Sequence, residues 1–164
     1  MQINIGCFYF IKDVFFKIID DPELMQNKEN GNKRPCYYCF RSKKYNDIIW
    51  FIPVSTKIEK YHKIYIKKIQ KQIILGKRPS IDTIVFGDVA NTYSAFLIQN
   101  MFPVTKEYVK SQYTKNKVAI RLSNKLQTEI IYKANKVLNL YMHGMKNIIF
   151  PDIDRILEQL LQNK

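Results

Sequence analysis

The sequence predicts an α+β fold, in which helices pack on a compact, mostly antiparallel sheet. A nearly continuous run of β-branched and aromatic residues at 47–54 has the composition of a strand that is covered on both faces. A second strand-like segment at 36–41 precedes it closely enough to form a hairpin through 42–46. Two later segments, 58–76 and 123–143, repeat their apolar residues every three or four positions, as amphipathic helices do.

The other elements are expected in the following order. A first strand covers 3–11, and Asp13 caps a short helix that runs over 14–19. The polar segment from Asp20 to Lys33 is rich in Asn and therefore predicts a loop. Further strand pieces are expected at 81–87, 93–98, 101–104 and 108–109.

Glycine and proline mark the expected ends of these elements. Gly76 and Gly144 are expected just beyond the two long helices, because glycine accepts the left-handed conformation that ends a helix. Gly87 is expected to begin a loop after its strand. Pro151 is expected in the first turn of a last helix that ends near Leu161.

Length and charge bound the class of protein. A chain of 164 residues predicts a single domain that spans 1–164. The net charge of +13 and the isoelectric point of about 9.6 indicate a polyanionic partner, with nucleic acid favoured over an anionic membrane. The longest apolar runs fall far short of the roughly 18 residues that a membrane span needs. With no signal-peptide pattern at Met1, we expect a cytoplasmic protein without a membrane partner.

Three cysteines are expected to be reduced residues of the core or sheet. Cys36 and Cys39 have the spacing of half a zinc site, but no second pair of ligands accompanies them. They also fall in a predicted strand, where residues three apart face opposite sides. Carboxylates are scattered along the chain, without a cluster suited to Mg²⁺. The sequence therefore predicts no metal and no cofactor.

The strongest candidate site follows the central strand. Ser55, Thr56 and Lys57 come directly after it, so a rigid element would hold two hydroxyls and a cation at one place. This set suits metal-independent RNA cleavage, because the ribose 2′-OH is a nucleophile that the substrate supplies. If 36–41 and 47–54 form a hairpin, Lys33 or Arg34 falls beside these hydroxyls. A polar strand end or a helix cap is the alternative role for the two hydroxyls.

A basic face on the helix that follows is the second candidate feature. Its lysines lie mostly opposite the apolar stripe, and tyrosines among them can stack on unpaired bases. His62 is interpreted as a surface residue that stands near the candidate site. The residues expected to contact RNA are Lys60, Tyr61, His62, Lys63, Lys67, Lys71 and Arg78, together with Tyr9 of the first strand.

Several short motifs resemble a known toxin family. The segments Phe8–Asp13, Arg34–Tyr38 and Trp50–Lys57 occur in an order and spacing similar to the ToxN/AbiQ group of type III toxin–antitoxin endoribonucleases. The segments Ser55–Tyr61 and Ser94–Pro103 look closest to the CptN branch of that group. The resemblance implies a compact toxin similar to the MazF/Kid ribonuclease fold.

The resemblance also implies an activity and a partner. It implies sequence-selective cleavage of cellular or phage RNA, typically in A-rich contexts, that leaves a 2′,3′-cyclic phosphate. The antitoxin would be a pseudoknotted repeat RNA that the toxin processes and that then inhibits it in a closed toxin–RNA hetero-oligomer. The family's hydroxyls fall on Ser55 and Thr56, and its basic residue before the early strand falls on Lys33 or Arg34. Because the proline of the family pattern is absent after Thr56, Lys57 and Lys60 both remain candidates for its second cation.

Two other functions remain open at this point. The same basic face would serve a non-catalytic module that binds RNA or DNA. A ribonuclease toxin with a protein antitoxin is the other alternative. The sequence leaves the biological role open between phage defence and plasmid or locus maintenance.

Overall fold

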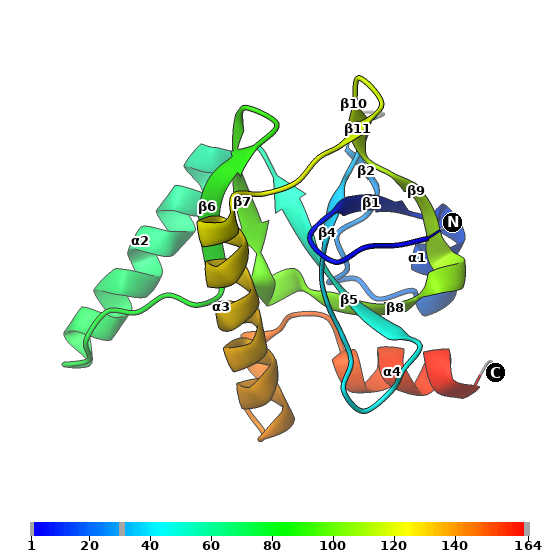
Figure 1. Ribbon diagram of the computed structural model, residues 1–164. Helices are drawn as coiled ribbons and strands as arrows, with labels where there is room; N and C mark the ends of the chain where they lie inside the picture. Colours follow the sequence, from blue (N-terminus) through cyan, green and yellow to red (C-terminus); the bar gives the residue numbers. More distant parts are fainter. Residues whose placement is uncertain (1, 30–31, 163–164) are drawn as a thin grey trace.

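Strand β5 (Ile48–Ser55) is the centre of the sheet in the computed structural model, which describes residues 2–29 and 32–162 (Figure 1). All eight of its residues are buried. It pairs antiparallel with β4 (Cys36–Arg41) along one edge. Along the other edge its first half pairs with β8 (Phe102–Thr105) and its last two residues with β7 (Thr92–Leu97). The hairpin and the doubly covered strand that the sequence predicts are confirmed.

The main sheet extends outward from this centre on both sides. Its strand order is β6-β7-β5-β4-β1-β9, with β8 paired to β5 beside that path. The outer strands are β1 (Phe8–Ile11), β6 (Ile84–Val89) and β9 (Val109–Gln112). Neighbouring strands of this sheet run antiparallel. Two short ladders stand apart from it, β2 (Lys28–Glu29) with β3 (Asn32–Lys33) and β10 (Thr114–Lys115) with β11 (Val118–Ala119).

The described part of the chain forms four α-helices around the sheet. They are α1 (Asp13–Ile19), α2 (Ile58–Ile74), α3 (Asn124–Met142) and α4 (Ile153–Gln162). Single 3₁₀ turns lie at Ile98–Asn100 (η1), Lys106–Tyr108 (η2) and Lys146–Ile148 (η3). Ser123 begins α3 by accepting a hydrogen bond from the Leu126 amide at 3.3 Å. The α+β class with a mostly antiparallel sheet is therefore as predicted.

The core between these layers is largely aromatic. Phe8, Tyr37 and Phe96 pack as tilted and edge-on pairs with ring centres 5.2 to 6.3 Å apart. Phe51 stacks on Phe102 with ring centres 6.5 Å apart, and Trp50 is 2% exposed. Burial of such rings removes a large apolar area from water, so the core holds β5 and its ends in fixed places.

Several predicted boundaries are wrong. The first strand covers only Phe8–Ile11, and the predicted loop from Asp20 to Lys33 contains the short β2–β3 ladder. Lys12, not Asp13, is the residue before helix α1, and Asp13 is its first helical residue. The last helix begins at Ile153 after Asp152, whose carboxylate accepts from the Arg155 amide at 3.1 Å. Local signals predicted the helices and the strands of the main sheet but placed their ends one to several residues away, and they did not predict the β2–β3 and β10–β11 ladders.

Gly87 lies inside a strand rather than at the start of a loop. It pairs with Ser94 in the middle of the β6–β7 hairpin, and Ala90 and Asn91 make the turn with positive φ angles of 51° and 67°. A Cβ atom at position 87 would collide with the Leu126 side chain of α3. The glycine therefore allows close packing of a helix on the strand, which a local sequence pattern does not reveal.

The cysteine and membrane expectations can be compared with the described residues. Cys7, Cys36 and Cys39 are free and buried. Burial raises the pKa of the Cys36 thiol to about 12 and raises that of Cys39, which keeps both thiols protonated near neutral pH. Within residues 2–29 and 32–162, no helix combines the length and apolar character of a membrane span.

Candidate active site

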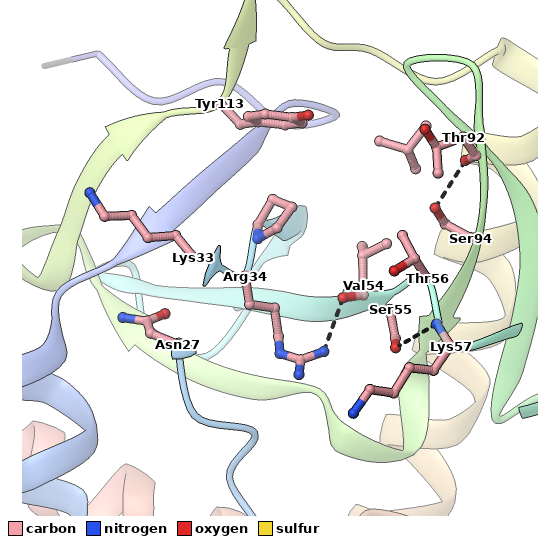
Figure 2. A pocket seen from close by; sticks show the side chains of 12 residues that line it. Asn27, Lys33, Arg34, Val54, Ser55, Thr56, Lys57, Thr92, Ser94 and Tyr113 are labelled. Atoms are coloured by element: carbon pink, nitrogen blue, oxygen red, sulfur yellow. Dashed lines mark hydrogen bonds between the residues drawn. The ribbon is translucent and has the colours of Figure 1, made fainter. Parts of the chain in front are cut away.

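A cavity of about 360 Å³ opens where β5 ends, beside the start of β4 (Figure 2). The hairpin register explains its position, because Cys36 at the start of β4 pairs with Pro53 near the end of β5. Residues just before β4 therefore meet residues just after β5. The cavity is lined by Asn27, Lys33, Arg34, Pro35, Val54, Ser55, Thr56, Lys57, Val89, Thr92, Ser94 and Tyr113.

The structure brings together the five residues that the sequence predicts as catalytic. Lys33, Arg34, Ser55, Thr56 and Lys57 line this one cavity. Three of them are cations, and none of the described residues that line it is acidic. Cations therefore outnumber acidic groups among the described lining residues, and the cavity favours an anion.

The Arg34 guanidinium is held in place at the cavity wall. Its Nη1 donates to the Val54 carbonyl at 3.2 Å, and its Nε lies 3.4 Å from the Gln26 carbonyl. These contacts fix the planar fork between β5 and the segment before β2. Such a fork donates parallel hydrogen bonds to a phosphate.

Ser55 is buried and makes a turn rather than a helix cap. Its Oγ accepts a hydrogen bond from the Lys57 amide at 3.2 Å, and Lys57 is the residue that precedes helix α2 without a side-chain cap. In that bond the hydroxyl is the acceptor, so its own proton can be donated to another group. Figure 2 shows the Lys57 side chain extending towards the side of the cavity where the Arg34 guanidinium lies.

Lys33 has a different surrounding from Arg34. Its ammonium lies 6.0 Å from the centre of the Phe10 ring, and in Figure 2 it points away from Ser55. The structure therefore separates the two basic residues that the sequence leaves as equals. Arg34 is next to the hydroxyls, whereas Lys33 lies at the outer wall.

Four polar or aromatic lining residues were not predicted from the sequence. Ser94 and Thr92 come from β7, where the Ser94 hydroxyl donates to the Thr92 carbonyl at 3.0 Å. Tyr113 packs edge-on against Phe10 with ring centres 5.7 Å apart. Asn27 is buried, and its amide nitrogen donates to the Ile11 carbonyl and to the Asp13 carboxylate. Their distance along the chain from Ser55 explains why the sequence did not place them at the site.

Two predicted RNA contacts are contradicted by burial. Tyr9 is 0% exposed, and its hydroxyl accepts from the Asn4 amide at 2.8 Å. Tyr61 is 4% exposed and packs in a small cluster with residues of β6 and β7. Neither ring has an open face for a base, because each serves the core. The sequence places Tyr9 in a predicted strand and Tyr61 on the apolar stripe of a predicted helix, but it does not show how deeply each ring is buried.

The other predicted RNA contacts lie on or beyond α2. Lys60 lies on a second cavity that Arg34 also lines. His62 is exposed and packs edge-on against Phe86 with ring centres 4.4 Å apart. The remaining four are exposed and continue away from the cavity along the helix and the loop after it: Lys63, Lys67, Lys71 and Arg78.

A metal site is not evident from the acidic, His and Cys side chains of residues 2–29 and 32–162, since no three of them gather as a ligand set. What the cavity does offer is hydroxyls and cations. Such groups can orient a phosphodiester and stabilise negative charge on its oxygens.

Comparisons with known proteins place the fold. No protein-family model matches the chain, and no curated protein matches it. Two solved structures match it with TM-scores of 0.65 and 0.66, at 13% and 11% sequence identity. The first covers 98% of both chains and concerns selective inhibition of a toxin by a non-coding RNA pseudoknot in bacterial type III toxin–antitoxin systems. The second covers 95% of this chain and 98% of the other, and concerns a bacterial antiviral system that a processed non-coding RNA regulates.

The chain shares their fold. At this level of identity the match describes the architecture over nearly the whole chain and does not transfer individual residues. A weaker match, the Mycobacterium tuberculosis toxin MazF-mt6, has a TM-score of 0.41 at 9% identity and covers 81% of this chain.

Proposed function

We propose that this protein is a metal-independent, sequence-selective endoribonuclease toxin of a type III toxin–antitoxin system. The observation that carries the proposal is that Arg34, Ser55 and Lys57 line one cavity, which brings a hydroxyl and two cations together. The shared fold supports it, because one structure with this fold comes from work on toxin inhibition by an RNA pseudoknot.

In this proposal the substrate supplies the nucleophile. The ribose 2′-OH attacks the adjacent phosphorus and loses its proton, the bond from phosphorus to the 5′-oxygen breaks, and that oxygen takes up a proton. The products are a 2′,3′-cyclic phosphate and a 5′-hydroxyl. The Arg34 fork and the Ser55 hydroxyl would stabilise the phosphoryl oxygens, which gain charge in the transition state.

Lys57 is the stronger of the two candidates for the second cation. It lines the cavity with Ser55, whereas Lys60 lies on the neighbouring cavity. We propose that Lys57 contacts the reacting phosphate and that Lys60 contacts RNA beside it. Thr56 would assist in orienting the phosphate, and Lys33 would attract RNA from the outer wall.

Expression without its antitoxin tests the enzyme proposal. The wild-type protein should stop bacterial growth, and Ser55→Ala should restore it. Ser42→Ala is a matched control, because the Ser42 hydroxyl also accepts turn amides, from Lys44 at 3.3 Å and Tyr45 at 3.2 Å, but lies outside the cavity. A toxic Ser55→Ala variant would contradict the role of this hydroxyl. Harmless wild-type protein that leaves RNA intact would favour a binding module.

The inhibitor is proposed to be a pseudoknotted repeat RNA that the toxin cuts and then binds in a closed toxin–RNA assembly. Purification of the protein from its native operon tests this. An RNA partner gives nucleic-acid absorbance that disappears on nuclease treatment, together with release of active toxin. A protein that co-purifies in stoichiometric amount, in place of RNA, would contradict the RNA antitoxin.

A further inference from the structure

A second cavity, of about 490 Å³, lies next to the candidate active site. Arg34 lines both cavities, and its two backbone contacts mark the boundary: Val54 lines the first cavity and Gln26 the second. Lys60 of α2 stands at the second cavity as well. A chain whose phosphate sits at Arg34 can therefore place its next nucleotide in this space.

Two buried amides line the second cavity, and both offer unused hydrogen-bonding groups. Asn100, in η1, is 7% exposed, and its side-chain amide makes no hydrogen bond to the described part of the chain. Gln99 is 3% exposed, and its Oε1 accepts from the Lys68 ammonium at 2.9 Å. That bond orients the Gln99 amide. Its Nε2 makes no hydrogen bond to residues 2–29 and 32–162 and can donate to a ligand. A ligand that enters the cavity can therefore pair with both amides.

The walls of the cavity are suited to a flat, apolar ring. Phe150 is 44% exposed and is fixed beside Gln99, because its amide donates to the Gln99 carbonyl at 2.8 Å. Met25 and Ile64 add apolar surface, and Glu23 adds a carboxylate to the lining. Aromatic stacking combined with amide hydrogen bonds is the usual way in which proteins recognise an unpaired base.

We propose that this second cavity binds one nucleobase of the RNA, that of a nucleotide beside the cleaved phosphate. The inference rests on the proposed function and adds to it the site of sequence selection. Asn100 supplies one donor and one acceptor to the base edge, Gln99 supplies a further donor, and Phe150 stacks on the ring. Lys68 is a positioning residue, because it acts through the Gln99 amide.

A pool of RNA with random sequence tests the proposal when the bases around every cut are determined. The wild-type protein should prefer one base at a single position beside the cut. Asn100→Ala should reduce that preference about tenfold, the usual size of one lost base contact, and leave the other positions unchanged. Phe150→Ala should weaken cleavage of the preferred sequence about tenfold as well. Asn135→Ala on the exposed face of α3 is the matched control and should change neither quantity.

Two results separate the failure of this inference from failure of the proposed function. If the wild-type protein cuts RNA and folded Asn100→Ala and Phe150→Ala retain its full base preference, the inference is overturned while the ribonuclease proposal stands. If the wild-type protein cuts no RNA, the proposed function fails, and binding then decides the role of the cavity. The binding assay uses a set of RNAs, each of which lacks the base at one position. In the wild-type protein, loss of the base that enters the cavity should weaken binding, whereas the Asn100→Ala variant should bind this RNA and the intact RNA equally well. Equal loss in both proteins, or in neither, would overturn the site.

Discussion

The two long helices of this protein have similar sequence patterns but different positions in the structure. Helix α3 buries Ile130, Ala134, Val137 and Tyr141, and packs along the sheet. Helix α2 buries Tyr61 in its first turn and stays in contact with the body as far as Lys68, whose ammonium donates to Gln99, but its last turns extend away from the body, as Figure 1 shows. Near its end the exposed fractions are 57% at Ile73, 83% at Ile74 and 59% at Leu75. Periodicity predicts that a helix forms, but the amount of sheet beside it decides how much of its apolar face is covered.

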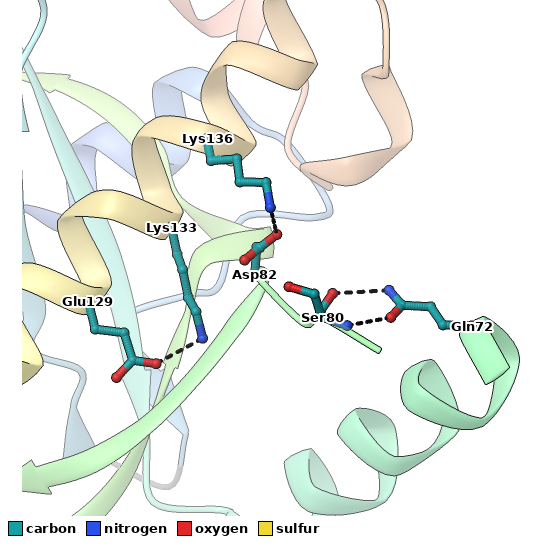
Figure 3. A network of polar contacts seen from close by, with 6 residues as sticks. All are labelled: Gln72, Ser80, Asp82, Glu129, Lys133 and Lys136. Carbon is teal, nitrogen blue, oxygen red and sulfur yellow. Dashed lines mark hydrogen bonds and ion pairs between the residues drawn. The ribbon is translucent and has the colours of Figure 1, made fainter. Parts of the chain in front are cut away.

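The polar contacts of the loop after α2 are consistent with this difference between the two helices (Figure 3). The Gln72 amide exchanges two hydrogen bonds with the Ser80 backbone, at 2.7 and 3.1 Å. Two residues later Asp82 pairs with Lys136 of α3 at 2.7 Å. The loop after α2 thus returns to the body, while the basic face of the helix stays exposed. The arrangement leaves α3 as a structural helix and α2 as the carrier of cations beside the candidate site.

The largest difference between the two helices should appear in the free energy of unfolding when an aspartate is placed in the apolar stripe of each. Val137→Asp should lower the free energy of unfolding by about 4 kcal/mol or more, because an aspartate would be buried without a partner. Ile73→Asp should change it by less than about 0.5 kcal/mol, because that side chain is exposed. Urea unfolding followed by circular dichroism measures both. Equal losses would mean that α2 is packed as α3 is.

Removal of the buried anchor of α2 should give the next largest effect. Tyr61→Ala should cost about 3 kcal/mol, because a buried aromatic ring would leave a cavity. Hydrogen exchange should then increase along α2 before it increases along α3. Lys60→Ala, one residue earlier and exposed, is the control and should leave exchange unchanged. Unaltered protection of α2 in Tyr61→Ala would show that other contacts hold the helix.

Lysine replacement should distinguish the two helices in RNA binding. Three exposed lysines lie on α2: Lys63, Lys67 and Lys71. Each should contribute about 0.7 to the slope of log affinity against log salt concentration, so replacement of all three by Gln should make this slope less steep. On α3, three lysines serve as the control, two of them paired with carboxylates at 2.7 and 2.8 Å: Lys125, Lys133 and Lys136. The measurement uses RNA with 2′-deoxyribose at the cut. A slope that is reduced only by the α3 replacements would contradict α2 as the RNA-facing helix.

The smallest effect concerns two lysines whose pKa values shift in opposite directions. Burial lowers the pKa of Lys68 on α2, and the Asp82 contact raises the pKa of Lys136 on α3. Lys136 therefore stabilises the fold below its ordinary pKa and loses this effect as pH rises through the raised value. For Lys68, burial of the charge opposes folding at neutral pH, and this cost disappears as pH rises through the lowered pKa towards the ordinary one.

Unfolding free energies between pH 7 and 11 measure the two contributions. The advantage of the wild-type protein over Lys136→Met should be below about 1 kcal/mol, since the Lys136 side chain is exposed to solvent, and should shrink at the alkaline end. Over the same pH range, the free energy of unfolding of the wild-type protein should rise relative to that of Lys68→Met. Changes of the same sign in both comparisons would contradict the assigned causes.

The sequence predicts the elements of this fold better than their surroundings. Composition alone was sufficient for β5, because a covered strand is almost continuously apolar. The hairpin with β4 then placed Arg34 beside Ser55, which the structure confirms as a juxtaposition. The burial of Tyr9 could not be predicted, because it depends on which residues of β9 and β4 pack around it. The place of Ser94 at the cavity could not be predicted for the same reason, since only the β5–β7 pairing brings its strand there.

Mapping the ends of RNA cut in vitro, with a chelator present, is the most direct test of the central proposal that Arg34, Ser55 and Lys57 cleave RNA without a metal. The wild-type protein should leave 2′,3′-cyclic phosphate and 5′-hydroxyl ends at a restricted set of sequences. Ser55→Ala and Arg34→Ala should each slow this cleavage about 100-fold or more, as loss of a charge-stabilising donor does in other enzymes. Cleavage that stops in chelator, or that leaves 5′-phosphate ends, would contradict the proposal.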